Sequence, residues 1–174
     1  RKRCCRRRHP EVRNGKGSSR RHHWPHSLSG ACPSQLAFVC SRSNYRCVAE
    51  AERTFGYVDV MVNNAGVQGP LGPVLSYPEN AFRQVMDVNV CGVFFGLQAA
   101  AQSMIRCGRG GVVVNLSSLA AARKPENMVA YNASKAAVES ITATAAKELG
   151  PSSIRVVAVA PGLLTGRLWT TQVQ

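Results

Sequence analysis

Tyr131 and Lys135 stand four residues apart in the stretch that runs from Val112 to Lys135. Residues four apart lie on the same face of a helix, so the Lys135 ammonium can lie beside the Tyr131 phenol. A phenol beside a cation gives up its proton more readily than a free one. Such a tyrosine can act as a general acid or base, so the pair predicts proton transfer to or from an alcohol or ketone oxygen.

Two serines, Ser117 and Ser118, precede this pair and directly follow the apolar run at 112–116. A serine hydroxyl held near the tyrosine can hydrogen-bond to a carbonyl oxygen and polarise it. The stretch therefore reads as a strand, a turn and a helix that together carry groups able to move a proton.

Short apolar runs alternate with longer segments of helical periodicity in the rest of the chain. The expected strands are 36–40, 58–62, 112–116 and 154–160. The expected helices are 46–55, 78–106 and 129–149. Apolar strands separated by helices predict right-handed crossovers and a parallel sheet with helices on both faces.

The expected helix ends carry recognisable signals. Gly56 follows the helix at 46–55, in the position where a left-handed residue often ends a helix. Ser76 and Glu79 match the S-x-x-E capping box for the next helix. Gly150 and Pro151 are expected to stop the helix at 129–149.

Polar turns follow three of the expected strands, at 63–66, 117–118 and 161–162. Ligands of open parallel sheets bind at the carboxyl ends of the strands, so we expect a site along this edge. Asn89 lies within the apolar face of the helix at 78–106 and is a further candidate, because a buried amide needs partners. The alternative is a structural asparagine that bonds to neighbouring backbone.

Taken in order, these motifs resemble those of the short-chain dehydrogenase/reductase family, and in particular its 3-oxoacyl-acyl-carrier-protein-reductase-like members. The matching residues are Asn63-Asn64-Ala65-Gly66, Asn89 in DVNVCGVFF, Ser118 in VVVNLSSLA, Tyr131 to Lys135 in YNASK, and Pro161-Gly162. The resemblance implies an α/β fold, with a partial Rossmann-like parallel sheet and flanking helices, that is, an incomplete doubly wound domain.

The resemblance also implies a role for each matching residue. Tyr131 would be the acid–base group, Lys135 would assist it and hold the nicotinamide ribose, and Ser118 would bind the substrate oxygen. Asn89 would kink its helix and hold a water in a proton relay. The residues expected to line NAD or NADP are Asn64, Ala65 and Gly66 on its adenosine side, with Tyr131, Lys135, Pro161, Gly162 and Leu164. No metal is implied. The implied reaction is hydride transfer between NAD(P) and a carbonyl or secondary alcohol.

Part of the family pattern is missing from this sequence. The T-G-x-x-x-G-x-G phosphate loop is not found, nor is the strand-end residue that would separate NAD from NADP. Each charge-assisted hydrogen bond lost with the loop is worth about 1.5–3 kcal/mol, so we expect weakened cofactor binding or an inactive chain. Thr165 lies four residues after Pro161, where the family usually has a threonine at five. The strand at 58–62 would also have an open apolar edge.

Residues 1–35 differ in composition from the rest of the 174-residue chain. Ten Lys or Arg and one acid give residues 1–23 a net charge of +9, out of +13 for the whole chain. The segment has three prolines and almost no apolar periodicity, so we expect a disordered basic tail before a partial NAD(P)-binding domain at 36–174. We favour a solvated tail or an artefact of a wrong start or shifted frame. A nucleic-acid-binding arm and a zinc site are weaker alternatives.

Seven unevenly spaced cysteines favour a reducing compartment over a disulfide framework, so we expect a cytoplasmic protein. We expect no secretory leader and no membrane span, because no run of about 18 apolar residues occurs. The expected partners are a small carbonyl or alcohol substrate and further copies bound through the helices at 78–106 and 129–149, which the family uses for oligomers. We do not expect nucleic acid as a partner. Two alternatives to an enzyme stay open: a non-catalytic oligomerising protein and a basic-tailed nucleic-acid binder.

Overall fold

The computed structural model describes residues 41–162 of the chain. Its helices are α1 (Ser41–Phe55), α2 (Glu79–Met86), the π-helical turn η2 (Asp87–Cys91), α3 (Gly92–Cys107), α4 (Ala120–Arg123) and α5 (Val129–Leu149), with short 3-10 turns η1 (Val74–Ser76) and η3 (Gly150–Ser152). Its strands are β1 (Val60–Asn63), β2 (Gly111–Leu116) and β3 (Ile154–Val159). The three expected helices and the strands expected at 58–62, 112–116 and 154–160 are therefore present, with shifted ends. The expected strand at 36–40 and tail at 1–35 lie outside the described residues.

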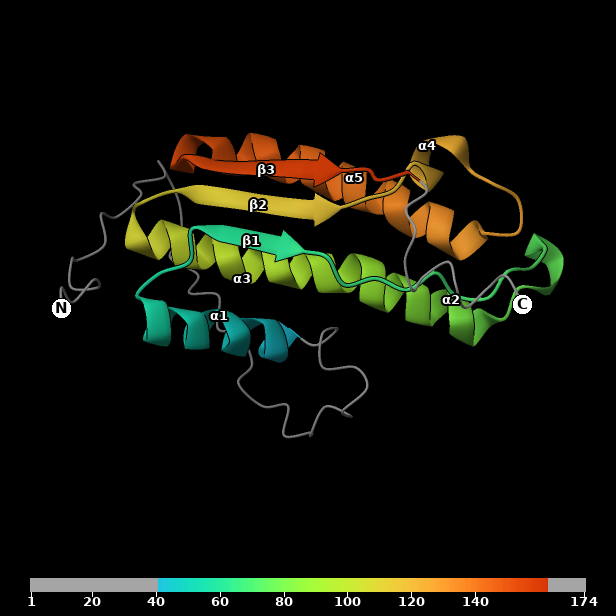
Figure 1. Cartoon of the computed structure of the whole chain (residues 1–174), viewed down its shortest axis with the longest axis horizontal. Helices are drawn as coiled ribbons and strands as arrows, with labels where there is room; N and C mark the ends of the chain where they lie inside the picture. Colours follow the sequence, from blue (N-terminus) through green and yellow to red (C-terminus); the bar gives the residue numbers. More distant parts are fainter. Residues whose placement is uncertain (1–40, 163–174) are drawn as a thin grey trace, which may run out of the picture.

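The strands form a parallel sheet in the order β1, β2, β3. Val60 of β1 lies opposite Val112 of β2, and Gly111 of β2 lies opposite Ile154 of β3. Because all three strands point the same way, their carboxyl ends lie along one edge of the sheet (Figure 1). This confirms a partial Rossmann-like parallel sheet with flanking helices.

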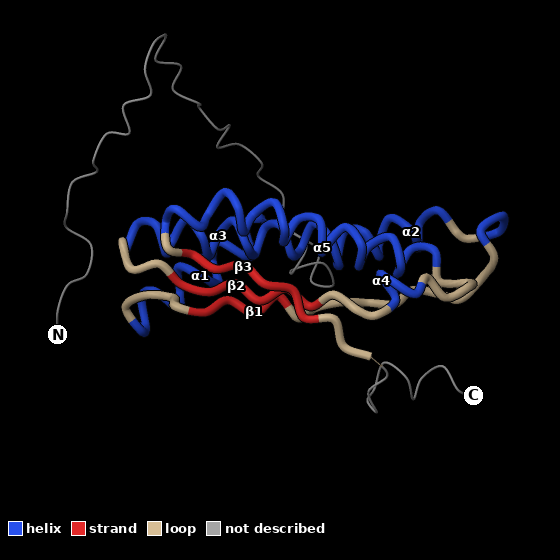
Figure 2. The backbone as a smooth tube through the Cα atoms, turned by 90° about the horizontal axis from the view of Figure 1, so that it is seen from above, coloured by secondary structure: helices blue, strands red, loops and turns tan. Residues whose placement is uncertain are grey.

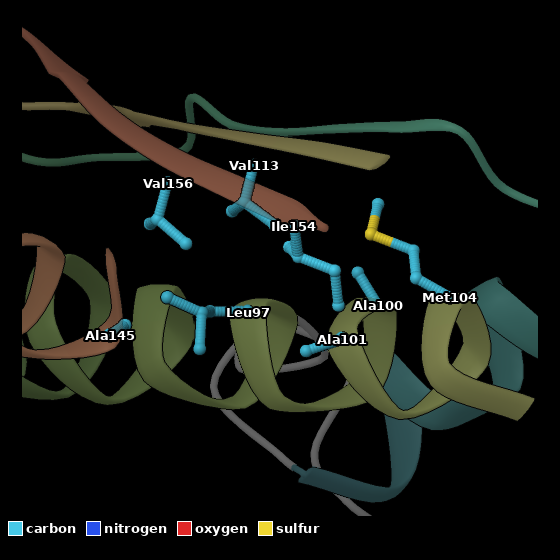
Figure 3. Packing of buried hydrophobic residues seen from close by; sticks show 8 residues of the cluster. All are labelled: Leu97, Ala100, Ala101, Met104, Val113, Ala145, Ile154 and Val156. Carbon is cyan, nitrogen blue, oxygen red and sulfur yellow. The ribbon is translucent and has the colours of Figure 1, made fainter. Parts of the chain in front are cut away.

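Two helices, α3 and α5, pack against one face of this sheet (Figure 2). Eight buried residues fill the space between them: Leu97, Ala100, Ala101, Met104, Val113, Ala145, Ile154 and Val156 (Figure 3). Small residues let α3 approach β1 closely, since a side chain at Gly96 would overlap the amide oxygen of Asn63. This close approach fixes α3 beside the carboxyl end of β1.

The opposite face of the sheet is apolar as well. We expected helices on both faces, but within residues 41–162 this second face is left open: Val60 is 56% exposed, Val62 53%, Val157 43% and Val159 46%. We expected two helical layers because the strands are apolar on both sides. The described residues build only one of them.

The first described helix, α1, packs against α3 on the β1 side of the molecule (Figure 1). Glu52 of α1 accepts hydrogen bonds from the Ser103 hydroxyl at 2.6 Å and from the Arg106 guanidinium at 3.0 Å. These contacts join the two helices at a distance from the carboxyl edge of the sheet.

One of the expected helix-end signals is wrong. Pro78 is the residue before α2, so Ser76, which lies in η1, is not its N-cap, and Glu79 bonds to Arg83 one turn later. Helix α5 ends at Leu149, as Gly150 and Pro151 predict; Gly150 has φ −52°, so the chain tightens into η3, and the left-handed residue is Ser153 at φ 59°. Gly56, at φ 95°, adopts the expected left-handed conformation.

The helix from Glu79 to Cys107 is long and apolar enough to cross a membrane by length and composition alone. Half of its most apolar window is buried inside the protein. Helices that form the core of a globular domain have this property too, and α3 contributes Leu97, Ala100 and Met104 to the core.

Candidate active site

Lys135 and Tyr131 lie on the first turns of α5, which begins at Val129. Lys135 is only 4% exposed, and its Nζ donates a hydrogen bond to the Leu116 carbonyl oxygen, 2.7 Å away at the end of β2. The same Nζ lies 5.6 Å from the centre of the Tyr131 ring. The expected placement of the cation beside the phenol is therefore observed.

Burial changes the acidity of this lysine. Removal of the ammonium from water lowers the pKa of Lys135 from 10.5 to about 8. Most molecules still carry the charge at pH 7, so a cation is present beside the Tyr131 ring under ordinary conditions. An ammonium has three hydrogens, and the bond to Leu116 uses one of them.

The two serines after β2 have different surroundings. Ser117 is buried, and its hydroxyl lies within hydrogen-bonding distance of Glu139 Oε1 at 2.8 Å and of the Lys135 carbonyl oxygen at 3.2 Å. Ser118 is half-buried, and its Oγ accepts a hydrogen bond from the Ala120 N–H at 3.2 Å. The Ser118 hydroxyl proton is thus left to donate, which suits the serine that we expected to bind a substrate oxygen.

Asn89 lies in the π-helical turn η2, where the long helix departs from regular α-helix. Its side chain is fully buried; Nδ2 donates to the Val67 carbonyl oxygen and to Ser134 Oγ, while Oδ1 accepts from the Val67 N–H. Both amide hydrogens are used inside the protein, so the side chain has none left for a water. The structural alternative, an asparagine bonded to nearby backbone, describes these contacts.

The turn after β1 reaches the same place. Asn64 and Ala65 are exposed, whereas Gly66 is half-buried and a Cβ atom on it would lie 3.5 Å from Lys135 Nζ and 3.3 Å from Asn89 Oδ1. We expected this turn on the adenosine side of a cofactor. The structure places Gly66 beside the lysine that we expected to hold the nicotinamide ribose.

The turn after β3 lies against the end of β2. The Pro161 carbonyl oxygen accepts a hydrogen bond from the Leu119 N–H at 3.0 Å, and Gly162 lies beside the Leu119 side chain. All three strand-end turns thus lie along one edge, as expected. Leu164 and Thr165 fall outside the described residues.

A buried polar chain that we did not predict lies behind this edge. Asn63 Nδ2 donates to Asn115 Oδ1 at 2.8 Å, and Asn115 Nδ2 donates to the Thr142 hydroxyl at 2.9 Å. This row of polar side chains ties β1 to β2 and β2 to α5, so Asn63 braces the sheet. A lone Asn in the apolar run VVVNL was the available signal.

Ser134 is the second residue that we missed. It is fully buried, accepts from Asn89 and donates to the Tyr131 carbonyl oxygen. Its place inside YNASK, directly before Lys135, was the only signal. No group of three or more metal-binding side chains occurs within residues 41–162, and the tail residues considered for zinc lie outside them.

Comparison with known proteins gives a consistent match. The sequence model of the short chain dehydrogenase family matches residues 34–174. The chain is 37% identical to a sorbitol dehydrogenase of Cereibacter sphaeroides over 139 residues, which are 80% of this chain and 54% of that protein. It is 41% identical to an (S)-acetoin-forming diacetyl reductase of Staphylococcus epidermidis over 115 residues, 66% of this chain and 44% of that protein. The chain thus spans about half the length of these relatives.

Solved structures of similar proteins superpose on this chain. An NAD⁺-bound xylitol dehydrogenase superposes with a TM-score of 0.74 at 39% identity, covering 78% of this chain and 52% of that one. A 3-ketoacyl-(acyl-carrier-protein) reductase of Brucella melitensis, complexed with NADH, gives a TM-score of 0.73 at 32% identity, covering 77% and 56%. With the motifs in order along the carboxyl edge of a parallel sheet, these matches show that the chain belongs to the short-chain dehydrogenase/reductase family.

Proposed function

We propose that this chain is an oxidoreductase that acts on a carbonyl or secondary-alcohol substrate with NAD or NADP. The observation that carries the proposal is the buried Lys135 ammonium, held by Leu116 at 2.7 Å and lying 5.6 Å from the centre of the Tyr131 ring. A buried lysine is costly to keep charged, so its place beside a phenol favours a chemical role over a purely structural one.

The residues at this edge fit the ribose of a nicotinamide cofactor. Lys135 keeps two hydrogens for hydroxyl acceptors, and Gly66 leaves open the space that a side chain would fill 3.5 Å from Nζ. Asn64, Ala65, Pro161 and Gly162 would line the rest of the described site, and Leu164 would extend it. The cofactor supplies or accepts a hydride.

The chain's own groups would handle the proton and the substrate oxygen. Tyr131 donates its phenolic proton to the oxygen of a carbonyl that is being reduced, and it takes the proton back when an alcohol is oxidised. The Lys135 cation stabilises the phenolate in between. Ser118 hydrogen-bonds to the same substrate oxygen. Asn89 holds the turn at Val67 in place, and a relay water would donate to its Oδ1, which accepts one hydrogen bond from the Val67 N–H and can accept a second.

A non-catalytic protein that assembles through the helices at 78–106 and 129–149 is the second candidate. Two observations favour it. The sequence has no T-G-x-x-x-G-x-G phosphate loop, and Phe94 and Ile105 of α3 are 43% and 51% exposed. If the chain is an enzyme, the same helix surfaces would let it form oligomers as well.

Titration of the purified chain with NADH and NADPH separates the two. Micromolar binding of either cofactor, followed by reduction of diacetyl or oxidation of sorbitol, supports the enzyme. These substrates are chosen because the names of two relatives contain them. Binding of neither cofactor, with a defined oligomer by light scattering, supports the non-catalytic protein.

The proposal includes a place in the cell and a division of the chain. We place the protein in the cytoplasm, since Cys47 and Cys91 are free thiols in the described part of the chain and the seven cysteines are unevenly spaced. We assign the cofactor to 36–174 and keep 1–35 as a basic tail. Binding to a DNA column is compared with and without residues 1–23. If the shortened chain is retained as strongly as the full chain, the tail is not the nucleic-acid binder.

A further inference from the structure

A set of buried polar contacts joins the turn at Gly66–Val67 to α5. Ser134 Oγ donates to the Tyr131 carbonyl oxygen at 2.8 Å and accepts from Asn89 Nδ2 at 2.9 Å. Ser134 is fully buried, so both functions of its hydroxyl are used inside the protein.

Asn89 transmits this contact to the turn. Its Nδ2 donates to the Val67 carbonyl oxygen and its Oδ1 accepts from the Val67 N–H, both at 2.8 Å. These two bonds hold the backbone of Val67 from both sides. The Ser134 hydroxyl accepts the remaining Nδ2 hydrogen and thereby fixes which way the amide faces.

The turn held in this way lies against the Lys135 ammonium. A Cβ atom on Gly66 would be 3.5 Å from Nζ, and Nζ is itself held at 2.7 Å from the Leu116 carbonyl oxygen. The gap between Gly66 and Lys135 is therefore set from two sides: by Leu116 on β2 and by the Ser134–Asn89–Val67 contacts.

We propose that Ser134 is a positioning residue that sets the gap between Gly66 and Lys135, and with it the affinity for the nicotinamide ribose. The proposal rests on the proposed function, because that function puts a ribose in this gap. Ser134 acts through Asn89 and Val67 and touches no reacting atom. Removal of its hydroxyl leaves one Asn89 Nδ2 hydrogen buried without an acceptor, which the amide relieves by turning away from Val67.

The test uses the full chain and the variant Ser134→Ala. Two matched controls are Ser140→Ala, an exposed serine of the same helix, and Ser103→Ala, a fully buried serine bonded to Glu52 on the far side of α3. The rate of amide hydrogen exchange at Val67 measures how firmly Asn89 holds this backbone. The dissociation constants of NADH and of ADP measure the effect of the gap between Gly66 and Lys135 on binding, because ADP lacks the nicotinamide ribose.

We expect Ser134→Ala to speed exchange at the Val67 amide and to weaken NADH about tenfold, while the ADP affinity is unchanged. Ser140→Ala should change none of these, and Ser103→Ala should lower stability without altering Val67 exchange or NADH affinity. A merely structural serine would weaken NADH and ADP alike.

Two results would overturn the proposal in distinguishable ways. If the wild-type chain binds NADH and Ser134→Ala binds it equally well, or loses NADH and ADP affinity together, the positioning role fails and the proposed function stands. If neither NADH nor NADPH binds to the wild type, the proposed function fails, and the link from Ser134 to ribose affinity fails with it, whether or not Val67 exchange responds to Ser134→Ala.

Discussion

Replacement of Lys135 by methionine should make the pH dependence of stability report directly on the buried ammonium. Methionine has a similar length and no charge. Burial lowers the pKa of Lys135 to about 8, against 10.5 for a free lysine. Between these two pH values the unfolded chain binds more protons than the folded chain, so the stability of the wild type rises with pH.

The magnitude follows from the same two numbers. The step from about 8 to 10.5 corresponds, at about 1.4 kcal/mol per pH unit, to about 3 kcal/mol. Below pH 8 the full cost of the buried charge is present, and above pH 10.5 it is gone. The hydrogen bond to Leu116 is available to the ammonium and to the neutral amine, so its loss shifts the comparison by a constant.

Urea denaturation of the two proteins at intervals from pH 7 to 10.5 measures this difference. Tyrosines and cysteines away from Lys135 titrate in the same range, but they are common to both proteins and cancel in the difference. Because Tyr131 lies beside Lys135, the comparison is repeated with Tyr131→Phe in both proteins. We expect the free energy of unfolding of the wild type to rise relative to Lys135→Met by about 3 kcal/mol across this window. A difference that is flat or falls with pH would show that Lys135 is not buried as a charge.

Three further changes test other parts of the structure. Ser118→Ala should lower kcat for carbonyl reduction about 100-fold with little loss of stability, whereas Ser117→Ala should cost about 1 kcal/mol of stability, measured by urea denaturation; equal kinetic effects would undo the distinction between them. Asn115→Val should lower the free energy of unfolding by about 1–3 kcal/mol because the Asn63 amide loses its acceptor at 2.8 Å and keeps only the longer bond to the Val93 carbonyl oxygen at 3.4 Å; an unchanged midpoint would count against the polar chain. Val62→Thr should reduce aggregation, measured by light scattering, with stability unchanged within about 0.5 kcal/mol; unchanged aggregation would show that this face is not the cause.

Periodicity and apolar runs were enough to predict most of the described fold. The helix at 129–149 and the strand at 112–116 were placed nearly to the residue, because each combines an unambiguous period with a clear stop. Helix caps were harder, since a capping box depends on side-chain geometry that competing partners can change. Ser76 lies in a 3-10 turn before Pro78, and Glu79 bonds to Arg83 one turn later, so the expected box did not form.

The site could be predicted only as far as its motifs reach. Tyr131 and Lys135 lie together because a four-residue spacing on a helix leaves little choice. The partners of Asn89 could not be predicted, because Val67 and Ser134 are brought to it by tertiary packing. The roles that the family resemblance gives to Ser118, Asn89 and the strand-end turns are still predictions.

The most direct test of the central proposal is turnover by the wild-type chain and by Tyr131→Phe, followed through NADH or NADPH absorbance with a panel of small ketones. Phenylalanine keeps the ring beside Lys135 and removes the only proton that Tyr131 can give. The account predicts cofactor-dependent reduction by the wild type and a loss of at least about 100-fold in the variant. Equal rates for the two proteins would contradict it.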